Sequence, residues 1–179
     1  MVTMPGKKAT MMTEATEALA ATALKLVEDA FAQRMPPSAI SDSHQLSDVE
    51  YDEVMSFDGM DWRDVAFDQV EKNADAVFWF SPEAFCYYLP GLLAAGLKAN
   101  RTDSNAYDSL IGMLDRSPEP EHWDNFFAPR WPLLSDAELE VVRAWVRWFA
   151  SVEPESFHGN TYERVDDTLT MLQLIREGA

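Results

Sequence analysis

Residues 76–97 read AVFWFSPEAFCYYLPGLLAAGL, and this stretch decides the fold because it concentrates aromatic and aliphatic residues around a helix-start signal. The signal is Ser81-Pro82-Glu83, which combines a side-chain cap, a proline at the first helical position and a carboxylate at the positive end of the helix dipole. A core helix is therefore predicted to begin at Pro82. Because Pro90 has no amide hydrogen, the helix is predicted to kink or restart there as two half-helices.

Helical periodicity on both sides of this stretch predicts further helices, and no alternating run is long enough to make a sheet. The fold class is therefore predicted as all-α, a single compact domain of about six to seven helices with one of them broken at Pro90. Residues 1–12 lack apolar periodicity and are predicted to be a disordered tail, and residues 13–179 are predicted to form the single helical domain. The expected helices follow Thr13, Ser47, Asp61, Ser81, Asn105, Ser135 and Asn160.

The composition excludes several classes of function. The chain has 179 residues, six Trp, ten Phe and a net charge of −17, so it is aromatic enough to fold and acidic enough to repel nucleic acid and anionic lipid. No apolar run is long enough to span a bilayer. The single cysteine, Cys86, cannot form an intramolecular disulfide, and a cytoplasmic location is expected.

The negative charge is concentrated in residues 42–83, where twelve carboxylates are opposed by Arg63 and Lys72. Such a region is typical either of a solvated surface that maintains solubility or of a surface that binds a basic protein. The candidate binding residues in this region are Asp48, Glu50, Asp52 and Glu53.

Motifs for catalysis, metals and cofactors do not occur in the sequence. The three histidines, His44, His122 and His158, have no second ligand at helical spacing, and no calcium loop or phosphate-binding glycine pattern is present. No catalytic residue, metal ligand or cofactor is therefore predicted, and Cys86 is interpreted as a core residue.

Two further groups are candidates for binding. Tyr87 and Tyr88 lie about 100° apart around their helix, so one hydroxyl at most is expected to lie deep in the core while the other borders a groove. Trp123, Arg130 and Trp131 belong to an aromatic loop that either forms a recognition patch or packs onto the core.

The pattern FWFSPEAFCYYLPGLL at residues 78–93, preceded by Asp61-Trp62, resembles a bacterial family of small proteins of unknown function. Family members share a similar Asp-Trp pair followed by a Ser-Pro-Glu-Ala-Phe run that ends in Tyr-Leu-Pro. The resemblance covers about residues 31–97 and implies a helical fold without indicating an activity. The chain departs from the pattern at Gly91, where a larger residue is expected.

Two hypotheses for function follow from these observations. The first is a non-enzymatic bacterial binding protein of the immunity or regulatory type, which uses its acidic region against a basic protein partner. The alternative is a small helical enzyme or ligand-binding protein with a groove near the Pro90 kink, in which Tyr87 or Tyr88 and Glu83 serve as acid and base. The sequence leaves the oligomeric state open.

Overall fold

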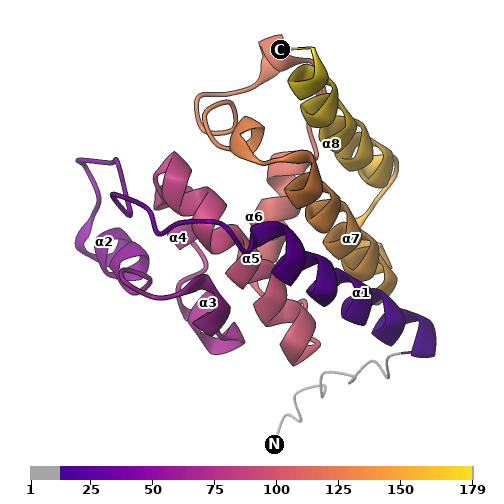
Figure 1. The fold of residues 1–179 in the computed structure, drawn as a ribbon, viewed down its shortest axis with the longest axis horizontal. Coiled ribbons are helices and arrows are strands. Elements are labelled where there is room, and N and C mark those ends of the chain that lie inside the picture. The colour runs from indigo at the N-terminus through magenta and orange to yellow at the C-terminus, as the bar shows by residue number, and fades with distance from the viewer. Residues whose placement is uncertain (1–12, 179) are drawn as a thin grey trace, which may run out of the picture.

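A computed structural model describes residues 13–178, in which eight α-helices and no strand occur (Figure 1). The all-α prediction is confirmed, and the predicted tail at residues 1–12 lies outside the described residues. The helices are α1 (Glu14–Phe31), α2 (Asp48–Met55), α3 (Phe67–Lys72), α4 (Ala76–Trp79), α5 (Pro82–Ala99), α6 (Asn105–Leu114), α7 (Asp136–Val152) and α8 (Thr161–Glu177). Short 3-10 turns are η1 (Trp62–Asp64), η2 (Pro120–His122), η3 (Trp131–Leu133) and η4 (Pro154–Ser156).

Helix α5 is the centre of the fold and is buried on all sides from Ala84 to Leu97. It is contacted by α1, α3, α7 and η1. The predicted restart at Pro90 is wrong, because α5 continues through this residue without interruption. A proline inside a helix costs about 3 kcal/mol, and the burial of both halves of α5 outweighs that cost.

The capping signals identified in the sequence operate in the structure. The Ser81 hydroxyl accepts a hydrogen bond from the Ala84 amide at 3.1 Å, so α5 begins at Pro82 as predicted. Complete capping boxes start α2 and α7, in which Ser47 and Ser135 each exchange hydrogen bonds with a glutamate three residues later.

The helix expected after Asp61 is divided into η1 and α3 by extended backbone at Val65 and Ala66. The 3-10 turn η1 packs so closely on α5 that a Cβ atom added to Gly91 would lie 2.4 Å from the Trp62 carbonyl oxygen. Trp62 is buried in the core. The glycine at position 91 therefore permits this close contact.

The helices are arranged in two groups around α5. Helices α1 and α7 pack against each other, and α8 covers α6 and α7. On the other side, α2 contacts α4 and lies at the outer edge of the molecule (Figure 1). Within the described residues, no helix is both long and apolar enough to cross a membrane.

Candidate functional site

Helix α2 carries the four acidic candidate residues and is attached to the domain along one side. Val54 and Phe57 are fully buried, and the Phe57 ring packs edge-on against the rings of Phe80 and Tyr88 at 5.3 and 5.5 Å between centroids. The inner side of α2 is therefore fixed in the core, and the side opposite Val54 is directed to solvent.

The outer face of α2 combines apolar and acidic side chains, and we define it as Asp48, Val49, Tyr51 and Asp52. Residues two apart lie about 160° apart around a helix, so Val49 and Tyr51 form opposite borders of this face and the two aspartates lie between them. Val49 is 68% exposed and Tyr51 is 53% exposed, which places both among the large apolar residues left on the surface. Asp48 and Asp52 are also exposed. Residues three and four apart are neighbours on a helix surface, so each aspartate flanks an exposed apolar side chain.

The aspartates of this face are not neutralised by the rest of the domain. No Lys or Arg within residues 13–178 forms an ion pair with Asp48, Asp52 or the neighbouring Asp58. Arg63, one of the two cations in residues 42–83, pairs instead with Glu28 and Asp61. The outer face of α2 is therefore a source of negative potential.

Of the other two acidic candidates, Glu50 has a structural role and Glu53 is partly buried. Glu50 accepts a hydrogen bond from the Ser47 amide at 2.7 Å and completes the capping box. Glu53 is half-buried, and its Oε2 atom has no hydrogen-bond partner in the described part of the chain. Burial, together with the charge of Asp75, raises the pKa of Glu53. Only Asp48 and Asp52 of the four present their carboxylates on the outer face.

The two tyrosine candidates lie in the core. Tyr87 is 4% exposed and Tyr88 is 1% exposed, so the expectation that one of them borders a groove is wrong. The Tyr88 hydroxyl donates a hydrogen bond to the Phe57 carbonyl at 2.5 Å. Pro90 is buried as well, so in the described part of the chain the position at which a groove was expected is covered.

The three candidate residues of the aromatic loop lie in the core or against it. Trp131 is fully buried, with its ring stacked on Phe127 at 5.5 Å between centroids, and Trp123 is half-buried. The Arg130 guanidinium is buried too, and it donates to the carbonyl oxygens of Phe80 and Phe126. These contacts hold the loop in place, which is the second of the two roles considered for it.

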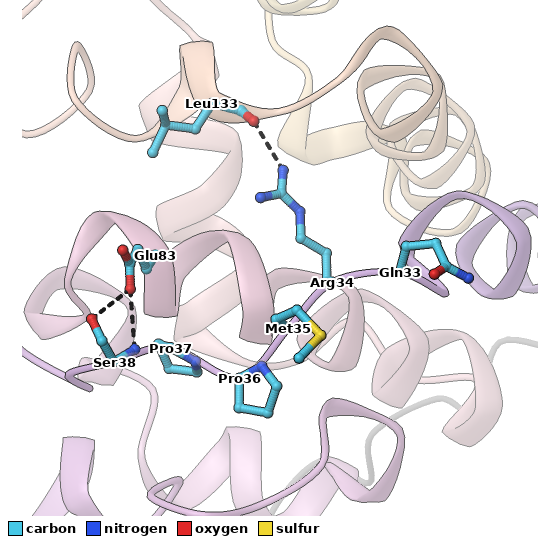
Figure 2. A pocket seen from close by; sticks show the side chains of 8 residues that line it. All are labelled: Gln33, Arg34, Met35, Pro36, Pro37, Ser38, Glu83 and Leu133. Atoms are coloured by element: carbon cyan, nitrogen blue, oxygen red, sulfur yellow. Dashed lines mark hydrogen bonds between the residues drawn. The ribbon is translucent and has the colours of Figure 1, made fainter.

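A groove of about 680 Å³ opens elsewhere, beside the first turn of α5 (Figure 2). It lies along the segment that follows α1. Its lining consists of Gln33, Arg34, Met35, Pro36, Pro37, Ser38, Glu83 and Leu133. The exposed apolar residues beside two prolines are the signal that could have drawn attention to this segment.

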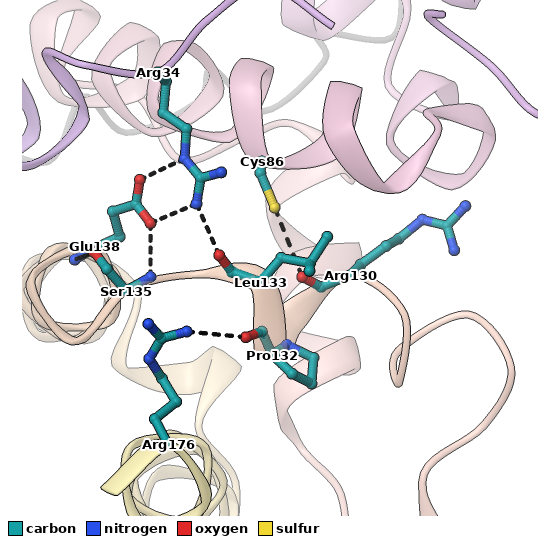
Figure 3. A network of polar contacts seen from close by, with 8 residues as sticks. All are labelled: Arg34, Cys86, Arg130, Pro132, Leu133, Ser135, Glu138 and Arg176. Carbon is teal, nitrogen blue, oxygen red and sulfur yellow. Dashed lines mark hydrogen bonds and ion pairs between the residues drawn. The ribbon is translucent and has the colours of Figure 1, made fainter. Parts of the chain in front are cut away.

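Polar contacts fix the floor of this groove (Figure 3). The Arg34 guanidinium donates to both carboxylate oxygens of Glu138 at 2.6 Å and to the Leu133 carbonyl at 2.9 Å. Nearby, the Cys86 thiol lies 3.6 Å from the Arg130 carbonyl oxygen. Burial raises the pKa of Cys86 to about 12, so this thiol is an inert core group as predicted.

No protein-family model, curated protein or solved structure matches this chain. The resemblance carried by residues 31–97 therefore stays a prediction. Within residues 13–178, no group of three or more His, Cys, Asp or Glu side chains is placed to hold a metal ion.

Proposed function

We propose that this protein binds a basic protein partner through the outer face of α2. The observation that carries the proposal is the combination of Val49 and Tyr51, both more than half exposed, with the unpaired carboxylates of Asp48 and Asp52. Exposed aromatic and aliphatic groups supply binding energy when a partner covers them, and unpaired charges supply orientation and steering.

The position of α2 supports a binding role. Its inner side is anchored by Val54, and the turn that follows it is anchored by Phe57, so the outer face is presented by a helix that is already formed. A preformed surface loses less conformational entropy on association than a flexible acidic segment would lose. The partner should carry Lys and Arg side chains around an apolar or aromatic centre.

The enzyme alternative receives less support. It depends on a groove at Pro90 and on Tyr87 or Tyr88 acting with Glu83, but both tyrosines are buried and Glu83 is exposed at the start of α5. A binding role of the immunity or regulatory type requires none of these groups. The single free cysteine, which is buried, is compatible with a cytoplasmic setting.

The test is a capture experiment on three matched forms of the full chain. Wild-type protein, an Asp48→Asn/Asp52→Asn variant and a Glu163→Gln/Asp167→Asn variant are immobilised and incubated with lysate from the source cell at low salt. Glu163 and Asp167 are exposed on α8, so the two variants lose the same amount of charge at different places. A basic protein should be retained by the wild type and the α8 variant and lost by the α2 variant.

A second comparison examines the apolar part of the outer face. A Val49→Ser/Tyr51→Ser variant keeps all charges and should also lose the captured protein, because its apolar contact area is removed. Thermal unfolding followed by circular dichroism establishes that each variant is folded. Equal retention by all the variants, or equal loss from the α2 and α8 charge variants, would contradict the proposal.

A further inference from the structure

The groove beside α5 has apolar walls that are left uncovered by the domain. Met35 is 79% exposed and Leu133 is 48% exposed, and both line the groove together with the rings of Pro36 and Pro37. Met35 is thus almost entirely available to a ligand. Its flexible thioether side chain adapts to irregular apolar partners.

Several polar groups of the groove are hydrogen-bond acceptors. Pro36 and Pro37 have no amide hydrogen, and in the described chain no donor reaches the carbonyl oxygens of Met35, Pro36 or Pro37. The Glu83 carboxylate accepts hydrogen bonds from the amide and hydroxyl of Ser38 at 3.1 and 2.8 Å (Figure 2), and these bonds lower its pKa. Glu83 therefore presents a carboxylate to the groove, and no cation of the described residues pairs with it.

The cation in the groove is already neutralised. Arg34 is held by both oxygens of Glu138, whose side chain is 4% exposed, so this pair adds no net charge to the floor (Figure 3). The charge that remains is that of Glu83. A complementary ligand must therefore be positively charged, rich in hydrogen-bond donors and able to lie against proline and methionine.

We propose that this groove binds the arginine side chain of a peptide segment. A guanidinium group offers five donors in one plane and is more weakly hydrated than an ammonium group, so it suits a carboxylate bordered by apolar surface better than lysine does. The uncovered Met35 and Leu133 provide contact for an apolar residue next to the arginine. The groove uses different residues from the outer face of α2, and the inference extends beyond that surface.

The experiment measures peptide binding at Met35 directly. Protein labelled with ¹³C in its methionine methyl groups is titrated with capped tripeptides, and the Met35 signal is assigned by comparison with a Met35→Leu variant. The tripeptide Ala-Arg-Leu should shift the Met35 methyl signal in a saturable way. Its citrulline analogue, which has the same shape without the charge, should bind about tenfold more weakly. The lysine tripeptide should lie between them.

Two variants distinguish the effect of the Glu83 charge from the effect of the hydrogen bonds that Ser38 donates to it. Glu83→Gln should weaken binding of the arginine peptide by about tenfold, because it removes the charge that the guanidinium pairs with. Ser38→Ala removes one hydrogen bond to Glu83 but keeps its carboxylate, so binding should be retained. Glu155→Gln, a change at another exposed carboxylate, should have no effect.

Several results would overturn the inference. These are no saturable shift with the arginine peptide, equal binding of the citrulline analogue, tighter binding of a glutamate peptide, or equal losses in Ser38→Ala and Glu83→Gln. Arginine amide should bind clearly more weakly than the tripeptide, since it lacks the leucine; equal binding would point to a small metabolite and contradict a peptide occupant. None of these results depends on the partner captured by α2.

Discussion

Arg34, just after α1, and Glu138, in the first turn of α7, form a bidentate ion pair with both nitrogen–oxygen distances at 2.6 Å. The same carboxylate accepts a hydrogen bond from the Ser135 amide at 2.7 Å and completes the capping box of α7. One buried carboxylate thus starts a helix and joins it to another helix far away in the sequence.

We predict that Arg34→Ala lowers the free energy of unfolding by about 3 kcal/mol, because it leaves the buried Glu138 carboxylate without its cation. The control is Lys25→Ala, which breaks an ion pair with Asp29 in which both side chains are more than 60% exposed. That change should cost less than about 1 kcal/mol. Urea denaturation of both variants measures the difference, and similar losses would contradict the role given to the Arg34 pair.

Two glycines should respond in opposite directions to substitution by alanine. Gly91→Ala places a Cβ against the Trp62 carbonyl and should destabilise the protein by about 1–3 kcal/mol. Gly112 lies inside α6, is exposed, and has no atom within 4 Å of an added Cβ. Gly112→Ala should therefore stabilise the protein by up to about 1 kcal/mol. Melting temperatures that change in the same direction would show that the contact between η1 and α5 is described wrongly.

Stability should fall as the pH rises above about 9, because buried acids must stay protonated. Burial, with a smaller effect of Tyr87, raises the pKa of Tyr88 from 10.0 to about 12, and burial raises that of Cys86 from 9.0 to about 12. A group whose pKa is higher in the folded than in the unfolded protein stabilises the fold fully at pH values below its pKa in the unfolded protein. This stabilisation is lost as the pH rises through its pKa in the folded protein.

The measurement is the urea midpoint at several pH values between neutrality and pH 11. Tyr88→Phe removes the bond to the Phe57 carbonyl and should cost about 1 kcal/mol at neutral pH. Its midpoint should then fall less steeply with pH than that of the wild type. Parallel curves for the two proteins would contradict the contribution of Tyr88.

The local features of the fold were predictable, because caps and periodicity act within a few residues. Ser47, Ser81 and Ser135 start helices by bonding to amides three residues later. That α5 continues through Pro90 could not be predicted from neighbouring residues alone. Whether a proline ends a helix depends on what surrounds both halves, and α5 is enclosed by segments distant in the sequence.

The same reason explains the errors in the candidate sites. Tyr87 and Tyr88 were expected on different sides of a helix with one solvent face, but α5 has no solvent face over most of its length. By contrast, the density of acidic residues can be read from the sequence itself. The prediction that Asp48 and Asp52 lie on one short acidic helix is confirmed. The exposure of Val49 and Tyr51 beside them could not be deduced, because it depends on which side of α2 packs against the domain.

The most direct test of the outer face of α2 is the salt dependence of its complex. The captured protein is purified, and its dissociation constant for wild type and for Asp48→Asn/Asp52→Asn is measured by titration calorimetry from low to high salt. The wild-type complex should weaken steeply as salt increases, the variant complex should weaken less steeply, and the two curves should converge at high salt. Curves that are parallel or independent of salt would contradict an acidic surface on α2 that binds a basic partner.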